Sequence, residues 1–284
     1  CKVVRDLGLV DHDEPFTRLL TQGMVLRGGT VMSKSKGNVV DPDDMTARYG
    51  ADALRLYEMF VAPPEKEIEW TDAGLEGSAR FLGRVWRLVA PFAAEFAAGH
   101  DGAPAASEWS DTERALRRKT HDTINRVSTD IDPRVHLNTA VSALMELVND
   151  TYSFCERSQL GPFSDRGAAD ASAPASSLWV VKEAVEALIV MLSPFTPHLA
   201  EELWEAIGHT DGVEAAGWPT FDPTVARAEE LVLPVQVNGK VRARLAVGAE
   251  ISEADLRTLA LEHPQVQAHT SGKDVTRVVV VSRK

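Results

Sequence analysis

The stretch NTAVSALMELVNDTY, residues 138–152, spaces its apolar residues three and four positions apart. This spacing gathers them on one face of a helix, so we predict a helix that begins at Asn138. The predicted face consists of Val141, Leu144, Met145, Val148 and Tyr152. Because a helix with one apolar face must bury it against another element, this stretch predicts a helical packing partner on either side.

Similar helical patterns flank this stretch. Before it, Ser110-Asp111-Thr112-Glu113 has the form of a capping box that opens a helix. After it, residues 178–192 are strongly apolar, and the run Ser193–His198 is predicted to kink the chain before residues 199–207. Residues 72–89 carry a further stripe: Leu75, Leu82, Val85, Trp86 and Val89. We predict an antiparallel bundle of roughly four or five helices across residues 72–225, with loops at 97–107 and 161–177.

Residues 230–284 show a different pattern. Two β-rich runs, 231–237 and 240–247, flank Asn238-Gly239, which is a signal for a β-hairpin. We predict a short helix at 252–262 stopped by His263-Pro264, then a strand at 275–281. These elements predict a small α/β domain, whose strand pattern stops at its end without a closing partner.

The first 71 residues form the third predicted region. Short apolar pieces before residue 40 are consistent with brief strands or turns. Asp41 is the predicted N-cap of a helix with Pro42 at its first position, and Asp52 is the predicted cap of a second helix that ends before Pro63. The predicted fold class is therefore predominantly α with a small α/β part.

The charge of the chain is acidic overall but unevenly distributed. The 284 residues include 30 basic and 42 acidic side chains, a net charge of −12, which argues against a general nucleic-acid coat. Residues 231–284 hold eight basic and five acidic residues, a local charge of +3 that favours a polyanion contact there. Two cysteines give no disulfide framework, and no apolar run reaches membrane-spanning length. We expect a cytoplasmic protein.

The run Met32-Ser33-Lys34-Ser35-Lys36-Gly37-Asn38 combines two ammonium groups with two hydroxyls. These groups and nearby backbone N–H groups can bind phosphate oxygens, as in loops that stabilise charge during nucleotidyl transfer. A solvated surface turn would have the same composition, so the run alone leaves both readings open.

The wider sequence resembles the class I aminoacyl-tRNA synthetases. Residues 32–38 followed by Val39-Val40-Asp41-Pro42 resemble their KMSKS loop, with Val31 in place of the first lysine. The resemblance continues through Tyr49–Arg55, Ala62–Lys66 and Glu69-Trp70. From Leu75-Glu76-Gly77 and Arg80–Trp86, and again in residues 235–242, it looks specifically like the leucyl-tRNA synthetase family.

The resemblance implies a role in protein biosynthesis: ATP-dependent activation of leucine, with Mg²⁺ accompanying ATP, and transfer of leucine to tRNA(Leu). It assigns Lys34 to stabilising charge on the departing pyrophosphate, with Met32, Ser33, Ser35 and Lys36 in the same ATP-binding loop. It also implies a helical anticodon-binding-type bundle, a C-terminal tRNA-binding domain and a monomer. The nucleotide-binding sheet and the editing domain of the family have no counterpart here, and the sequence opens on Cys1 in mid-pattern. We therefore expect a fragment that binds tRNA weakly and does not aminoacylate by itself.

Two other readings fit the same residues. The chain could be a free-standing tRNA-binding module descended from a synthetase. It could also belong to an isoleucyl- or valyl-tRNA synthetase, since these share the lysine loop. The segment Asn238–Arg242 near the far end favours the leucine enzyme.

Two sets of basic residues are candidate tRNA contacts. Arg80, Arg84 and Arg87 recur on one helical face, where a solvated arginine face is the alternative. Lys240, Arg242 and Arg244 alternate along the second hairpin strand, so we predict that all three project from one face, about 6–7 Å apart, where a polar solvent face is the alternative. We interpret Arg117, Arg118 and Lys119 mainly as surface charge.

Histidine and tryptophan residues give no separate site. His198 follows Pro197 in the predicted kink, and we assign it a packing role because no second ligand lies at metal spacing. Trp86, Trp179 and Trp204 are predicted core residues. No protein-bound metal is predicted.

Overall fold

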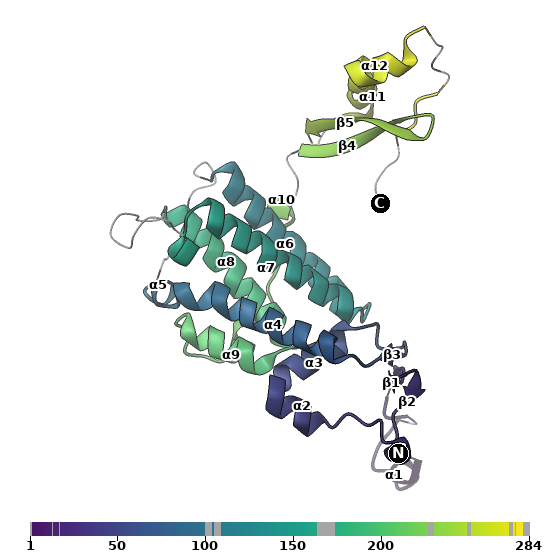
Figure 1. The fold of residues 1–284 in the computed structure, drawn as a ribbon, viewed down its shortest axis with the longest axis vertical. Helices are drawn as coiled ribbons and strands as arrows, with labels where there is room; N and C mark the ends of the chain where they lie inside the picture. The colour runs from purple at the N-terminus through teal and green to yellow at the C-terminus, as the bar shows by residue number, and fades with distance from the viewer. Residues whose placement is uncertain are drawn as a thin grey trace. The chain divides into compact units, whose positions relative to one another are not determined.

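The computed structural model describes residues 2–12, 14–16, 18–99, 104, 109–163, 174–226, 230–248, 251–272, 275 and 277–280. The chain forms two compact units, residues 1–221 and residues 222–284. Figure 1 shows both with their elements labelled.

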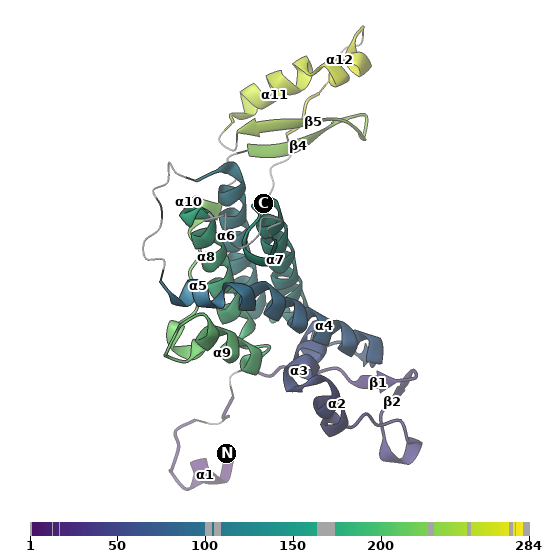
Figure 2. The ribbon, with the colours of Figure 1, turned by 60° about the vertical axis from the view of Figure 1, so that its left-hand side comes forward.

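The first unit is built on the predicted helices. Its long helices are α4 (Asp72–Val89), α6 (Asp111–Ile131), α7 (Leu137–Arg157) and α8 (Ala175–Leu192), followed by the shorter α9 (Pro197–Ala206). The helices α6, α7 and α8 pack side by side in both views (Figures 1 and 2). Short elements complete the unit: α1 (Lys2–Asp6), α5 (Ala93–Ala97) and one-turn 3₁₀ helices at Lys34–Lys36, Ala90–Phe92, Gly161–Phe163 and Val213–Ala216.

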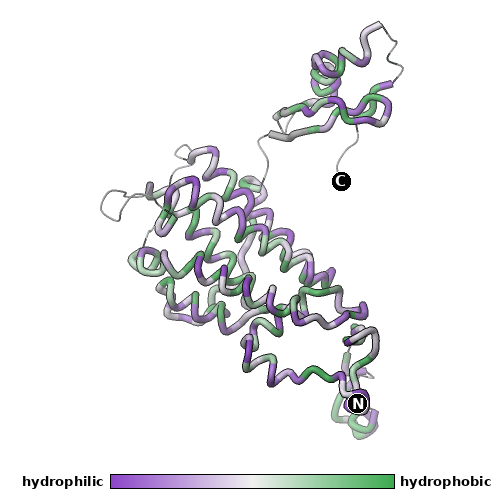
Figure 3. The backbone as a smooth tube through the Cα atoms, viewed as in Figure 1, coloured by the Kyte–Doolittle hydropathy of each residue, from purple (hydrophilic) through white to green (hydrophobic). Residues whose placement is uncertain are grey.

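The central stripe on α7 is buried as its spacing predicts. Val141, Leu144 and Val148 are fully buried, and Met145 and Tyr152 pack against the same core from its margin. Helix α8 is apolar around most of its circumference (Figure 3), because it lies between α6, α7 and α9. The predicted antiparallel bundle is confirmed.

The N-terminus of α6 is held by the predicted capping box. Ser110 Oγ accepts a hydrogen bond from the Glu113 N–H, and the Glu113 carboxylate accepts from the Ser110 N–H at 2.7 Å. Glu113 also accepts from Ser177 Oγ at 2.7 Å, so the same carboxylate ties the start of α6 to α8. Burial acts to raise the pKa of Glu113, but the hydrogen bonds from the serines outweigh it and lower the pKa below its usual value.

Trp86 does not lie in the core, contrary to the prediction. Its side chain is 40% exposed, while Val85 and Val89 of the same helix are fully buried. Trp86 follows Val85 by one residue, or about 100° around the helix, which places it at the edge of the buried stripe. Trp204 is buried and Trp179 packs against the core, as predicted.

The N-terminal part of this unit holds a small sheet and two helices. Strands β1 (Val25–Arg27), β2 (Thr30–Val31) and β3 (Ile68–Glu69) form a sheet in the order β2-β1-β3, with β1 and β3 parallel. Helices α2 (Pro42–Tyr49) and α3 (Ala51–Phe60) follow, and Asp41 caps α2 as predicted. A second apolar cluster of Ala53, Tyr57, Trp70 and Leu75 lies here, apart from the main core.

Asp52 has a different role from the predicted one. It does not cap its own helix, whose N-cap is Gly50. Its buried carboxylate instead accepts hydrogen bonds from the backbone N–H of Leu199 at 2.7 Å and of His198 at 3.4 Å, at the start of α9. A carboxylate supplied from elsewhere in the fold can cap a helix as well as a residue of that helix can.

The second unit is a hairpin with two helices on one face. Strands β4 (Glu230–Val237) and β5 (Lys240–Gly248) pair antiparallel around Asn238 and Gly239, which have φ values of 52° and 77° as a two-residue turn requires. Helix α11 (Glu253–Glu262) begins at the Ser252 cap. His263-Pro264 ends α11 as predicted. The same residues start a further helix, α12 (Pro264–Thr270), which was not predicted. The short helix α10 (Pro223–Ala226) precedes the sheet.

The strand predicted at 275–281 is wrong for the residues that are described there. Residues 277–280 have no strand structure and pair with neither β4 nor β5. A β-branched run favours extended backbone, but a strand also needs a neighbour to pair with. Within the described residues, no helix is long and apolar enough to cross a membrane.

Candidate functional site

The lysine run lies on a short turn beside the β1–β2 hairpin. Lys34–Lys36 form one turn of 3₁₀ helix that ends at Gly37, whose φ of 65° is left-handed. Ser33 begins the turn, since its hydroxyl accepts from the Lys36 N–H at 3.3 Å. The Ser33 and Ser35 hydroxyls are 3.1 Å apart and hydrogen-bonded to each other.

Asn38 fixes both ends of this turn. Its side-chain oxygen accepts from the Ser33 N–H at 2.9 Å, and its amide nitrogen donates to Thr30 Oγ1 at 3.1 Å and to the Val31 carbonyl at 3.4 Å. Asn38 was part of the recognised motif but was not predicted as a site residue. Its partners lie five to eleven residues away, so periodicity could not reveal the role, although asparagine commonly bonds to nearby backbone in turns.

The two lysines of the turn present free positive charge. Both side chains belong to exposed residues. Within the described part of the chain, neither ammonium of Lys34 or Lys36 lies within salt-bridge distance of a carboxylate. An exposed pair of unneutralised cations next to two hydroxyls is suited to binding phosphate oxygens.

The side chain of Met32 is partly buried, unlike those of the lysines that follow it. This side chain packs against the second apolar cluster. Val31, which stands where the motif has its first lysine, is exposed at the end of β2. Met32 therefore anchors the turn, and the exposed groups of the turn are Lys34, Ser35 and Lys36.

Glu69 joins the hairpin to the start of the bundle. Its carboxylate accepts from the backbone N–H groups of Gly28 at 2.5 Å and Gly29 at 3.2 Å. Both glycines have left-handed φ values, 64° and 70°, which orient these N–H groups toward one acceptor. Because Glu69 ends β3 just before α4, the hairpin is tied to that helix.

The three arginines of α4 are in different environments. Arg80 is exposed and only loosely paired with Glu76 at 3.7 Å, and Arg87 is exposed. Arg84 Nη1 donates to Asn149 Oδ1 of α7 at 2.5 Å, and its guanidinium lies 4.7 Å from the centre of the Tyr152 ring. Arg84 therefore links α4 to α7, and Arg80 and Arg87 are the more available cations.

Arg117 is not surface charge. Its side chain is 19% exposed, and it makes two hydrogen bonds to the Glu183 carboxylate, at 2.9 and 3.1 Å. The guanidinium also lies over the rings of Trp109 and Trp179, at 4.8 and 5.2 Å. Lys119 pairs with Glu146 at 2.7 Å, so both residues join helices of the bundle.

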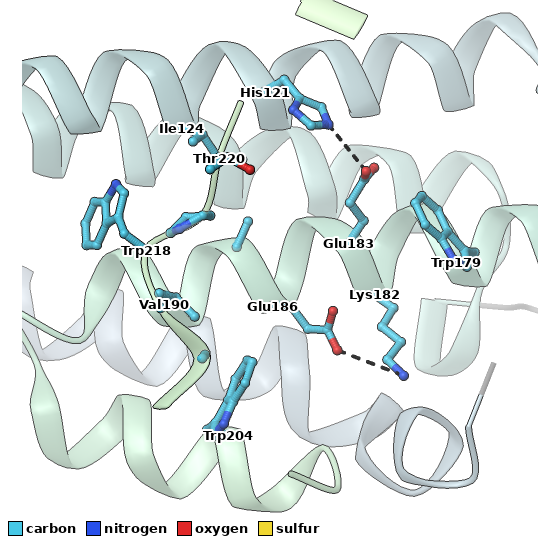
Figure 4. A pocket seen from close by; sticks show the side chains of 14 residues that line it. His121, Ile124, Trp179, Lys182, Glu183, Glu186, Val190, Trp204, Trp218 and Thr220 are labelled. Carbon is cyan, nitrogen blue, oxygen red and sulfur yellow. Dashed lines mark hydrogen bonds and ion pairs between the residues drawn. The ribbon is translucent and has the colours of Figure 1, made fainter. Parts of the chain in front are cut away.

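A cavity of about 540 Å³ lies beside this ion pair, between α6, α8, α9 and residues 216–220 (Figure 4). Its polar walls are already paired internally. Glu183 accepts from Arg117 and contacts His121 at 3.3 Å, and Glu186 contacts His209 at 3.0 Å. Burial acts to raise the pKa of Glu183, but the contacts with His121 and Arg117 outweigh it and lower the pKa. These groups stabilise the fold without leaving an unsatisfied group aimed at a ligand.

His198 does not have the predicted packing role, because its side chain is 75% exposed and its contact is with a carboxylate. Its Nδ1 lies 2.8 Å from the Asp52 carboxylate, beside the N-terminus of α9. Across the residues that the structure describes, no group of three or more histidine, cysteine, aspartate or glutamate side chains could hold a metal ion.

The basic residues of β5 do not share one face, contrary to the prediction. The register shifts between Val235 and Gln236, so Arg242 has no partner across the hairpin. Lys240 pairs with Val237, whereas Arg244 pairs with Pro234. An extra residue in one strand changes the alternation of side chains, so Lys240 and Arg244 project from opposite faces.

Comparison with known proteins gives consistent matches. Residues 113–257 match the family model described as the anticodon-binding domain of tRNA ligase, and residues 7–71 match that of class I tRNA synthetases (I, L, M and V). The whole chain is 48% identical to a leucine–tRNA ligase of Syntrophobacter fumaroxidans and 46% identical to one of Geobacter sp. strain M21, and covers 32% of each. The chain thus spans about a third of the length of these curated relatives.

A solved structure shows the same fold. The chain superposes on the leucyl-tRNA synthetase of Agrobacterium radiobacter K84 (agnB2), solved in a ternary complex with tRNA and LeuAMS, with a TM-score of 0.80 and 32% identity. That match covers 99% of this chain and 33% of the other.

Proposed function

Because the chain belongs to the leucine–tRNA ligase family, we propose that it supplies the ATP-phosphate loop and part of the tRNA-binding surface of such a ligase. The reaction would be the activation of leucine by ATP, with Mg²⁺ bound to the ATP, followed by transfer to tRNA(Leu). As part of such an enzyme the chain would act in the cytoplasm as a monomer. These assignments rest on the family and on the geometry of the lysine turn.

The unpaired cations of the turn carry the proposal. Lys34 and Lys36 are exposed, and the cap from Ser33 together with Asn38 holds the backbone that presents them. Lys34 would stabilise the charge that develops on the departing pyrophosphate, and Ser35 and Lys36 would contact the same phosphates. None of these groups needs to act as an acid or base, since the role is electrostatic.

The test uses the full-length ligase that contains this chain. We expect Lys34→Ala to slow leucine-dependent ATP–pyrophosphate exchange by about 10²-fold, the usual cost of losing one preorganised charge-stabilising group. Lys66→Ala is the matched control, because Lys66 is also an exposed lysine near the sheet. An unchanged exchange rate in Lys34→Ala, with both variants folded, contradicts the assignment.

The tRNA contact is proposed for the available cations of both units. Arg80 and Arg87 of α4 and the two arginines of β5, Arg242 and Arg244, would bind phosphates without reading sequence. The 284-residue chain alone should bind tRNA(Leu) weakly, with affinity that falls as salt rises, and should not charge it. Charging of tRNA by the purified chain above background would refute the second statement.

A further inference from the structure

The register of the β4–β5 hairpin shifts by one residue near its turn, and this shift changes which side chains of β5 share a face. From Glu230↔Gly248 to Val235↔Ala243 the strands pair regularly. Beyond that point Gln236 pairs with Val241, and Arg242 is left as an extra residue in β5. This is a β-bulge, which re-aims the side chains on the bulged strand.

The exposure of the side chains identifies the two faces. Ala243 and Leu245 are buried on the inner face, the one against which α11 and α12 pack. Val241 would join them in a regular strand, but it is 53% exposed. Val241 pairs with the exposed Gln236, so it lies on the outer face.

The outer face therefore carries two arginines beside apolar residues, among them Val241 and Pro234, which pairs with Arg244. Arg242 and Arg244 are exposed, and Val241 lies next to them on the strand. Lys240 pairs with Val237 beside the turn, so its side chain lies on the same side of the hairpin as the inner face. Within residues 230–248 and 251–272, the side chains of Lys240, Arg242 and Arg244 have no carboxylate at salt-bridge distance.

We propose that Val241, Arg242 and Arg244 form one RNA-binding face, and that Lys240 lies outside it. The two guanidinium groups would bind backbone phosphates, for which their planar donor sets are suited. The local charge of +3 in residues 231–284, on a chain of net −12, supplies the charge complementarity to a polyanion. The inference rests on the proposed tRNA function and names which side of the hairpin serves it.

A charge-conserving swap tests the face. The double variant Lys240→Ala with Val241→Lys moves one positive charge from the inner phase to the outer face and leaves net charge unchanged. Binding of the full 284-residue chain to a tRNA(Leu) transcript is measured over a series of salt concentrations. We expect the swap to bind roughly five- to tenfold more tightly than the wild type, with a salt slope steeper by about 1, as one added phosphate contact predicts.

Single variants separate the possible results. Arg244→Ala and Arg242→Ala should each weaken binding by a similar factor and flatten the slope, whereas Lys240→Ala should change neither. If Lys240→Ala weakens binding as much as Arg244→Ala, or the swap binds no better than wild type, the face is assigned wrongly although tRNA binding stands. If none of these variants changes the affinity of the chain for tRNA or its salt dependence, the proposed tRNA function of this unit fails instead. Circular dichroism checks that each variant is folded.

Discussion

Replacing Asp52 with alanine should destabilise the first unit through a helix to which Asp52 does not belong. The buried carboxylate accepts from Leu199 N at 2.7 Å and from His198 N at 3.4 Å, in the first turn of α9. A hydrogen bond to a charged acceptor contributes about 1.5–3 kcal/mol, and this range already includes the cost of leaving the part-buried N–H without a partner. The contact with the exposed His198 ring adds little, so we expect a total of about 2–3 kcal/mol.

Tryptophan fluorescence during urea unfolding measures the loss in the free energy of unfolding of the first unit. All six tryptophans of the chain lie before residue 222, so the signal reports the first unit alone. For a unit of this size the expected loss corresponds to a fall in Tm of about 4–10 °C. Asp52→Asn keeps one acceptor oxygen and should lose less than Asp52→Ala.

Asp43→Ala is the matched control. Asp43 occupies the second position of α2, as Asp52 does in α3, but it is exposed. If Asp52 acted only through the dipole of its own helix, the two alanine variants would lose similar small amounts, about 0.5 kcal/mol. A loss in Asp52→Ala no larger than that of Asp43→Ala would refute the capping of α9.

Three further perturbations test other contacts. Asn38→Ala should speed hydrogen exchange at the Ser33 amide, because this amide loses its acceptor, while the bundle helices stay protected. If the Ser33 amide exchanges at the same rate in the variant and the wild type, the Asn38 hydrogen bond does not hold the turn. Glu183→Gln should destabilise by about 2–3 kcal/mol at pH 7, since it leaves the half-buried Arg117 without its counter-charge. The pKa of Glu183 is lowered in the fold, so its contribution to the free energy of unfolding is present above the usual value of 4.5 and is lost as the pH falls through the folded pKa. The stabilities of the wild type and Glu183→Gln should therefore converge in acid. Urea titrations at several pH values measure this. The Cys155 thiol should resist alkylation until the unit unfolds, since burial raises its pKa to about 12, and rapid labelling of Cys155 in the native chain would contradict its burial.

The helical part of the fold was predictable because its signals are local. The stripe on α7, the Ser110–Glu113 capping box and the Asn238-Gly239 turn each depend on residues a few positions apart. Hydrophobic spacing and turn preferences act at that range. The exception, Trp86, lies at the margin of its stripe, where periodicity cannot distinguish a buried ring from an exposed one.

Features that depend on distant residues were not predictable from the same signals. Asp52 precedes its partner Leu199 by 147 positions, and a residue at the start of a helix is normally assigned to that helix. The bulge at Arg242 was equally hidden, because Val241, Ala243 and Leu245 alternate as a regular strand would. In the candidate site, Lys34 and its neighbours came from the motif, but the tie through Asn38 appeared only in the folded chain.

The second apolar cluster sets how easily the lysine turn can open. It has four buried residues, Ala53, Tyr57, Trp70 and Leu75, far fewer than the main core. Helix α3 serves both clusters, since Leu56 lies in the main core while Ala53 and Tyr57 lie in the small one. A sub-global opening could therefore release Met32 and the turn while the bundle stays folded, at a free energy well below that of unfolding the whole unit. The turn is thus attached to a small cluster that can open separately from the main core, so a loop with the proposed nucleotide-binding role can move there at small energetic cost.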